Sequence, residues 1–440
     1  MMNFKKIFIF LLVFHKQLLA QDIQSATLPS AVLTLSESMD IAEKNSTELK
    51  QSQQSVDYYQ NVHFLNYFNM LPSVMASAKY TWTPQSPSNI NMNQLQNANL
   101  LNVTVTQPVT GILQSSYKLG QLTSQTEAAK QDFTATKITA RVSGAIAFIK
   151  AYQDLQNIEI KKFDLDNANQ QYQETKTLFE SGDENKTKID LLQMQAKLLN
   201  AESDFETAKN HYLNSLANLK NILKIDNKLN IELKEDNFLN IEQQKIPELS
   251  FLIEKSLNLR GEIKSLNYNI KAKNDSINQS MFDFFPKLDA FINYQKSFSS
   301  SSNSDLSTSN PLSFGLNFNW HIWDGAITVE NKMTKVYELN KLKTEMDSKK
   351  YAIISSVTES YQNLIAAIQV FPKIKLAANT LEEAFKLSKI KYKTGNLSAS
   401  ELLNVQNSYV SAKLNLAKLR SDIDLSWIKL QGEVGNIPKY

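Results

Sequence analysis

The sequence consists of two successive copies of one plan, and this duplication restricts the folds that are open to it. Glu48-Leu49-Lys50 returns as Glu262-Ile263-Lys264, and Leu71-Pro72 returns as Phe285-Pro286, in both cases 214 residues later. Gly111 and Gly325 are also 214 residues apart, and Gly182 and Gly395 are 213 residues apart. Repeats in this order predict two similar structural units. We place them at 21–246 and 247–440, after a segment 1–20.

Helix breakers are scarce, so each copy has room for a few very long elements. The chain has 10 Gly and 10 Pro in 440 residues, or about 4.5% where average usage gives roughly 12%. This shortage excludes a many-turned sandwich, a propeller or a series of short βα units. Each copy is predicted to contain, in order, a helix (33–70 and 247–284), two strands, a long helix (112–181 and 326–394) and a further helix (188–223 and 398–434).

The strands are predicted at 73–83, 100–109, 287–297 and 312–323, where apolar and polar residues alternate. In the last of them Phe314, Leu316 and Phe318 alternate with Gly315, Asn317 and Asn319. Ten to twelve residues suit a tilted transmembrane strand with one lipid face and one wet face. An ordinary soluble hairpin has the same periodicity. The membrane interpretation predicts an aromatic girdle of Tyr80, Trp82, Tyr294, Trp320 and Trp323.

Four strands cannot close a membrane barrel, whose smallest single-chain form has about eight. Open sheet edges are not tolerated in lipid, so membrane strands require several chains to share one barrel. Apolar residues in the predicted helices step by three and four, as in Leu191, Met194 and Leu198 of the helix 188–223, which predicts coiled-coil seams. A helix of ~70 residues spans about 105 Å. Pro372 predicts a kink near 368–372 in the second long helix.

The first twenty residues have the features of an export signal. Lys5 and Lys6 precede an apolar run at 7–14, and Ala20 offers a small residue for cleavage. No later stretch approaches 18 apolar residues, so we expect no membrane-spanning helix. The chain has 47 Lys and Arg against 44 Asp and Glu. Removing the segment leaves the two numbers equal, which argues against nucleic-acid binding.

Three segments carry a resemblance to a known family, the TolC-like outer-membrane efflux proteins. Residues 33–45 are similar to the opening of these proteins, residues 313–325 to their last strand and its turn into the long helix, and residues 392–406 to their second helical tip. The resemblance implies an α+β membrane protein with two tandem repeats. Its homotrimer would share a 12-stranded β-barrel, four strands per chain, that continues into a long α-helical coiled-coil barrel.

The same resemblance implies a function and partners. The trimer would lie in the outer membrane, with a helical domain in the periplasm. It would act as a passive exit duct for tripartite efflux or type I secretion, gated at its periplasmic tip. Its partners would be outer-membrane lipid, a periplasmic adaptor (membrane fusion) protein and an inner-membrane transporter. A secreted or periplasmic coiled-coil scaffold without a pore is the alternative.

At the tip, the resemblance implies an aperture of Glu401, Asn404, Tyr392 and Asp190. It implies adaptor docking at the turns around Gly182, Gly395 and Leu397. In the family a basic residue follows the second Gly, and Leu397 replaces it here. The first tip is longer and more charged than the second, which leaves adaptor docking there open. Glu401 and Asp190 also fit an ordinary role as acids in the first turn of a helix.

Nothing in the sequence points to an enzyme, a cofactor or a metal site. His63, His211 and His321 are far apart, and the repeat does not bring them to a shared position. The chain has no Cys, no phosphate-binding loop, no dinucleotide fingerprint and no nucleophile elbow. Energy for transport would therefore come from a partner.

Overall fold

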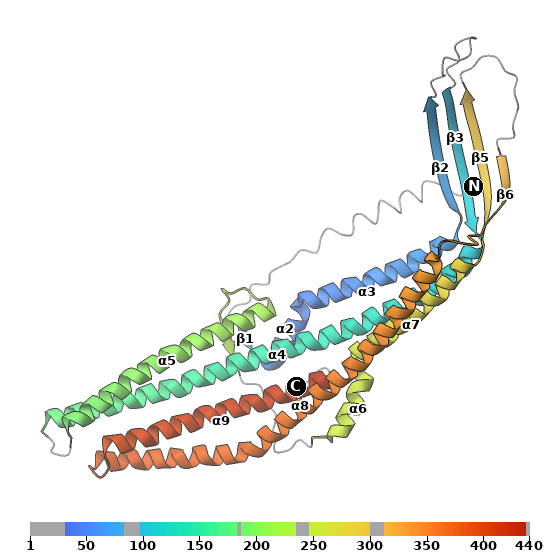
Figure 1. The fold of residues 1–440 in the computed structure, drawn as a ribbon. Helices are drawn as coiled ribbons and strands as arrows, with labels where there is room; N and C mark the ends of the chain where they lie inside the picture. Colours follow the sequence, from blue (N-terminus) through green and yellow to red (C-terminus); the bar gives the residue numbers. More distant parts are fainter. Residues whose placement is uncertain (1–30, 83–96, 183–185, 235–245, 300–311, 437–440) are drawn as a thin grey trace.

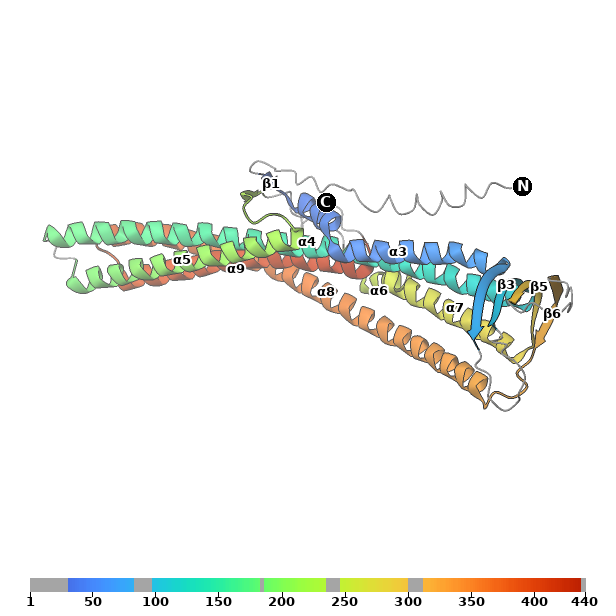
Figure 2. The same ribbon diagram turned by 90° about the horizontal axis from the view of Figure 1, so that it is seen from above.

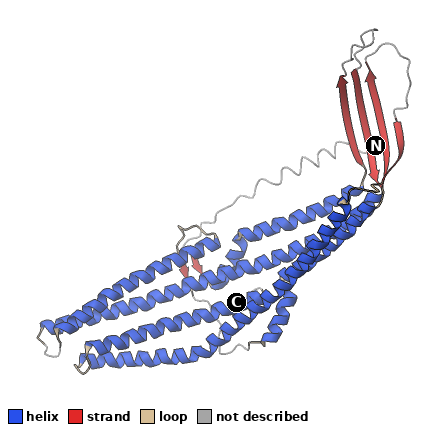
Figure 3. Ribbon diagram, viewed as in Figure 1, coloured by secondary structure: helices blue, strands red, loops and turns tan. Residues whose placement is uncertain are grey.

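The computed structural model describes residues 31–82, 97–182, 186–234, 246–299 and 312–436. The molecule is long and largely helical, with a four-stranded sheet at one end and the ends of two helix pairs at the other (Figures 1 and 3). The first half contains β1 (Ala31–Leu33), α2 (Leu35–Asn45), α3 (Thr47–Asn66), the 3-10 turn η1 (Tyr67–Met70), β2 (Ser73–Trp82), β3 (Asn97–Pro108), α4 (Thr110–Glu180), α5 (Lys188–Leu223) and β4 (Ile231–Leu233).

The second half follows the same order. It contains α6 (Leu249–Leu259), α7 (Gly261–Met281), the 3-10 turn η2 (Phe282–Phe284), β5 (Lys287–Ser299), β6 (Leu312–Asn319), α8 (Ile327–Lys393) and α9 (Ala399–Val434). The predicted signal at 1–20 lies outside the described residues.

The single helix predicted before each strand pair is wrong, because both stretches are divided in two. Ser46 separates α2 from α3 with an extended backbone (ψ 125°), and its hydroxyl accepts a hydrogen bond from the Leu49 amide at 3.1 Å. Arg260 separates α6 from α7 in a similar conformation (ψ 127°). Neither break lies on a Gly or Pro, although Gly261 opens α7 directly after Arg260. Both breaks let the short first helix turn away from the axis of the second.

The sheet is antiparallel, with the order β2-β3-β5-β6, so β2 and β6 are its two edges. Three of the predicted strands lie on β2, β3 and β5. The fourth, predicted to reach 323, is wrong at its end because β6 stops at Asn319. Asn319 pairs with Lys287, the first residue of β5, and no partner strand continues beyond it. Gly325 and Ala326 then adopt positive φ angles and turn the chain into α8.

The helices next to the sheet repeat the order of the strands. α3 leads into β2, α4 leaves β3, α7 leads into β5 and α8 leaves β6. Contacts between α3 and α4, α4 and α7, and α7 and α8 complete this row. Farther from the sheet, α4 packs with α5, and α8 packs with α9 (Figure 2). These pairs form two helical hairpins, the first made of α4 and α5 and the second of α8 and α9. The two hairpins contact each other through α4 and α9.

The long helices have the length that the sequence predicts. α4 has 71 residues and α8 has 67, so each extends about 100 Å. α8 continues through Pro372 without a break, and Figure 1 shows it bending along its course. A kink at 368–372 itself stays a prediction.

Three apolar clusters hold the helices together. The first joins α2, α4, α5, α9 and the short parallel pair β1–β4 around Met39, Phe148 and Leu219. The second joins α6, α7, α8 and α9 around Ile353 and Leu364. The third lies near the two turns, where Met194, Phe385, Tyr392, Ala399, Leu402 and Tyr409 come together. We call this third group the tip cluster.

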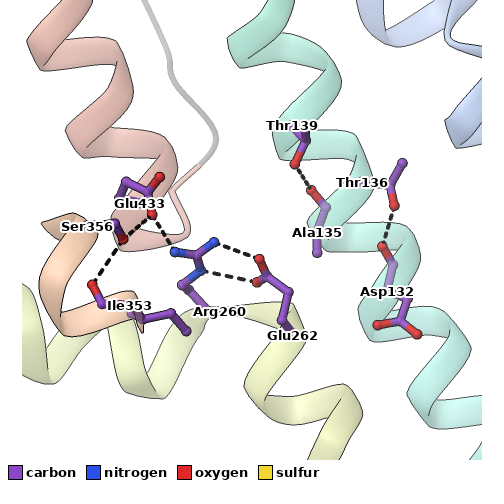
Figure 4. A network of polar contacts seen from close by, with 9 residues as sticks. All are labelled: Asp132, Ala135, Thr136, Thr139, Arg260, Glu262, Ile353, Ser356 and Glu433. Carbon is purple, nitrogen blue, oxygen red and sulfur yellow. Dashed lines mark hydrogen bonds and ion pairs between the residues drawn. The ribbon is translucent and has the colours of Figure 1, made fainter. Parts of the chain in front are cut away.

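Arg260 connects three helices where α6 meets α7 (Figure 4). Its guanidinium donates to both carboxylate oxygens of Glu262, at 2.6 and 3.2 Å, and also to Glu433 near the end of α9. The hydroxyl of Ser356 in α8 donates to Glu433 at 2.7 Å. Burial alone would raise the pKa of Glu262, but the hydrogen bonds and charge of Arg260 hold it below its ordinary value.

This network predicts a pH-dependent contribution to stability. Because the pKa of Glu262 is lowered on folding, its contribution is present above the ordinary value of 4.5 and is lost as the pH falls through the folded value. At neutral pH we expect Glu262→Gln to lower the free energy of unfolding by about 2 kcal/mol. Thermal unfolding of both proteins across pH checks this. A difference that stays constant down to pH ~3 would contradict it.

Candidate functional site: a two-faced sheet and a helical tip

The strand register places most of the apolar residues of the four strands on one face of the sheet, while Met75, Leu100 and Phe291 lie on the other. Val103 pairs with Ala76 on one side and with Tyr294 on the other, and Ile292 pairs with Phe314. Directly opposed residues point to the same face. The apolar face therefore contains Val74, Ala76, Ala78, Leu101, Val103, Val105, Leu288, Ala290, Ile292, Tyr294, Leu312, Phe314, Leu316 and Phe318.

This apolar face is not covered by the rest of the chain. Phe314 is 81% exposed, and Val74 and Leu316 are each 69% exposed. The opposite face contains Asn102, Thr104, Asn293 and Asn317, and Thr104 donates to Asn293 across the strands at 3.0 Å. A soluble hairpin would bury its apolar face on its own core, whereas here none of the apolar residues on this face is buried, and those of β2 and β6 are exposed or half-exposed. Such an arrangement fits lipid on one side and water on the other.

The predicted girdle residues occupy three different settings. Tyr80 in β2 and Tyr294 in β5 lie on the apolar face and are exposed. Trp320 and Trp323 lie beyond the end of β6, both exposed, and the Trp320 indole donates to the Phe284 carbonyl at 3.3 Å. Trp82 ends β2, and its side chain lies outside the described part of the structure. The girdle itself stays a prediction.

Both edges of the row of strands and helices carry apolar side chains that the chain leaves uncovered. On one edge α3 buries only Val56 and Asn66, while Phe64 and Leu65 are exposed. On the other edge Met333, Tyr337 and Tyr351 of α8 are exposed. Among the described residues, α8 is also the one helix with a stretch long and apolar enough to cross a membrane. The stretch passes by length and composition alone, so the expectation that no helix crosses the membrane stays a prediction.

The two turns at the far end have the same backbone conformation. Gly182 and Gly395 have φ angles of 78° and 77°, in the left-handed region that favours Gly at a helix end. Gly182 has no atoms within 4 Å of where a Cβ would lie. Leu397, in contrast, is half-buried against the tip cluster. The two glycines are thus exposed to solvent, whereas Leu397 packs partly against the tip cluster.

The two predicted aperture acids each cap a helix. Glu401 accepts hydrogen bonds from the Ser398 amide at 3.0 Å and the Ser398 hydroxyl at 2.7 Å. Asp190 accepts the corresponding bonds from Thr187 at 2.9 and 2.8 Å. The Ser398 bonds lower the pKa of Glu401. Asn404 lies one turn farther along α9 and is exposed. The capping role considered for both acids is therefore present, and Glu401 remains exposed while filling it.

Tyr392 of α8 faces the first hairpin and contacts two of its residues, Thr175 and Lys186. Its hydroxyl is 2.8 Å from the Thr175 hydroxyl in α4. The Lys186 ammonium, from the first turn, lies 3.5 Å from the centre of the Tyr392 ring and donates to its carbonyl at 3.1 Å. All three residues are buried, and burial raises the pKa of Tyr392. We call Thr175, Lys186 and Tyr392 the tip clamp.

The sequence pointed to Tyr392 but not to its partners. Thr175 is one of many polar residues in a long helix, and no pattern distinguishes it. Lys186 comes from the longer first turn and supplies a cation beside Tyr392, although Leu397 occupies the place where the resemblance implied a basic residue. Only the folded arrangement shows that the cation comes from the other hairpin.

A family model described as outer membrane efflux protein matches residues 39–223 and 252–436, which together make up most of the chain. The chain belongs to the outer membrane efflux protein family. The two matched segments coincide with the two halves of the fold. No curated protein matches the sequence significantly.

Solved structures share this fold across nearly the whole chain. The CmeC outer membrane channel of Campylobacter jejuni is 16% identical, with a TM-score of 0.79 over 92% of this chain and 86% of that one. VceC of Vibrio cholerae is 14% identical, with a TM-score of 0.76 over 92% and 97%. The open state of Neisseria gonorrhoeae MtrE is 15% identical, with a TM-score of 0.66 over 92% and 89%.

Membership of this family gives the two ends of the molecule a location and a role. The protein is an outer-membrane efflux channel, its sheet lies in the outer membrane, and its helices form a periplasmic domain. The family consists of channels rather than enzymes. In the part of the chain that the structure describes, no group of three acidic or His residues could hold a metal ion.

The tip clamp predicts a coupled pair of substitutions. Tyr392→Phe or Thr175→Val alone leaves one buried hydroxyl unpaired, which we expect to lower the free energy of unfolding by about 1–2 kcal/mol. The double variant removes both hydroxyls, so its loss should be smaller than the sum of the two single losses. Thermal unfolding of the four proteins measures the coupling. Additive losses would show that the two hydroxyls do not interact.

Proposed function

We propose that three copies of the chain form one passive exit duct, gated at its periplasmic tip, through which cargo leaves the cell. The observation that carries the proposal is the open four-stranded sheet with its uncovered apolar face. Backbone groups along an unpaired strand edge are too costly in lipid, so β2 and β6 need partners. Three copies give twelve strands, enough for a closed barrel with a wet lumen.

The helices beside the edge strands support the same assembly. α3 and α8 lie at the two ends of the row of helices, and both expose apolar side chains there. Pairing β6 with β2 of the next copy would bring α8 against α3 of that copy. Burying Met333 and Tyr337 against Phe64 and Leu65 would then extend the tube from the barrel into the periplasm. At about 100 Å the long helices can bridge a wide gap.

We locate the proposed gate at the tip, because both hairpins end there. Each chain would contribute Glu401 and Asn404 to a ring, and three exposed carboxylates would favour cations. The tip clamp would hold the second hairpin against the first in the closed state. Tyr392 joins them through Thr175, and Asp190 contributes to the electrostatic field at Tyr392.

The adaptor and the inner-membrane transporter are proposed to meet the channel at the same end. The turns at Gly182 and Gly395 are exposed, which suits docking of a periplasmic adaptor. Leu397 would serve mainly to seat the second turn on the tip cluster. Both tripartite efflux and type I secretion fit this arrangement, with transport energy supplied by the partner.

Glu401→Gln tests the gate without removing the helix cap, since Gln also serves at this capping position. We expect reconstituted channels of the variant to lose part of their preference for cations, while thermal stability changes little. The measurement is the reversal potential across a planar bilayer in a salt gradient.

Glu37→Gln is the matched control. Glu37 occupies the same capping position with Thr34 at the start of α2, far from the tip along the chain. It should leave ion preference unchanged. An unchanged reversal potential in Glu401→Gln would mean that Glu401 is only a helix cap.

A further inference from the structure

One side of α4 carries a line of buried polar residues toward the second hairpin. Asp164, Asn167, Gln171 and Thr175 follow one another at steps of three and four, so they share one face of the helix. All four are buried, and Asp164 and Gln171 are each only 2% exposed. The tip cluster is apolar and also joins the two hairpins, with Met194 from the first and Phe385 and Leu402 from the second.

Three of the four residues have partners on the second hairpin. Asp164 accepts from the Gln406 amide of α9 at 2.7 Å, and also from Lys197 of α5 at 2.8 Å. Asn167 accepts from Lys389 of α8 at 2.9 Å. Thr175 is bonded to Tyr392. The two hairpins therefore meet near the tip through polar contacts as well as through the apolar tip cluster.

Gln171 is the exception within this line. Both atoms of its side-chain amide are buried, and neither has a hydrogen-bond partner among the described residues. Thr175, one turn farther on, contacts Tyr392, which belongs to the tip cluster. An amide that has lost water and gained no partner destabilises the state that buries it.

We infer that Gln171 biases the tip toward opening, by destabilising the closed contact between α4 and the second hairpin. The inference rests on the gated tip proposed above. Separation of the hairpins returns water to the Gln171 amide, whereas Asp164, Asn167 and Thr175 lose the modest net stabilisation of their bonds to protein partners. The tip clamp and Gln171 thus act in opposite directions on one equilibrium.

Gln171→Leu tests the inference, because Leu fills a similar volume without polar atoms. It should shift the equilibrium toward the closed tip by roughly tenfold, given the usual penalty for an unpaired buried amide. The chain has no Cys, so Ala399→Cys provides a unique thiol. Ala399 is 1% exposed in the tip cluster. The rate of maleimide labelling of the full-length protein then reports how often the cluster opens.

Gln173→Leu is the control, since Gln173 lies two residues away on the same helix and is exposed. We expect labelling to slow about tenfold in Gln171→Leu and to stay unchanged in Gln173→Leu. Equal or faster labelling in Gln171→Leu would overturn the inference, since it would mean that the amide is satisfied in the closed state.

A second readout separates this inference from the proposed gate. Open probability in planar bilayers should fall in Gln171→Leu alongside the labelling rate. Slower labelling with unchanged open probability would support the effect of Gln171 on the tip but reject the tip as the gate. Altered open probability with unchanged labelling would retain the gate and reject the inference.

Discussion

The unpaired edges of the four-stranded sheet are the constraint on which the rest of the structure depends. Water can satisfy the free backbone groups of β2 and β6 in solution, but lipid cannot. Family membership places this sheet in the outer membrane, so its edges require other chains. The helices α3 and α8 continue the same two edges away from the sheet and expose apolar side chains there. On the proposed assembly, one chain forms a section of the channel wall rather than a complete channel.

The duplication gives the chain two similar halves. These halves contact each other differently near the sheet and near the tip. Near the sheet, the row of helices follows the order of the strands, and the two halves meet through α4 and α7. Near the tip, each half forms its own hairpin with an apolar seam. The contact between hairpins combines the apolar tip cluster with a line of polar bonds from Asp164 to Thr175. Apolar seams keep each hairpin intact, while polar contacts can exchange with water, so movement is expected between the hairpins.

Much of this fold could be predicted from the sequence, because the spacing of apolar residues and the positions of Gly and Pro indicate where strands and long helices lie. Alternation located the strands, and the rarity of Gly and Pro located α4 and α8. The count of Gly and Pro did not reveal the breaks at Ser46 and Arg260; the N-cap Ser46 was a signal that this count overlooks, whereas the Arg260 side chain makes no cap bond. Gln171 and Lys186 were equally hidden, because their importance arises from burial against the other hairpin. The capping bonds of Glu401 establish one of the two roles considered for it, while its role at the aperture stays a proposal.

The central claim is that the chain supplies one section of a shared channel. Native mass spectrometry of the protein, extracted from outer membranes in detergent, tests it most directly. The account predicts a particle of three chains, with one pore per particle after reconstitution. A stable single chain that remains inserted in the membrane would contradict it, because β2 and β6 would then be left unpaired in lipid.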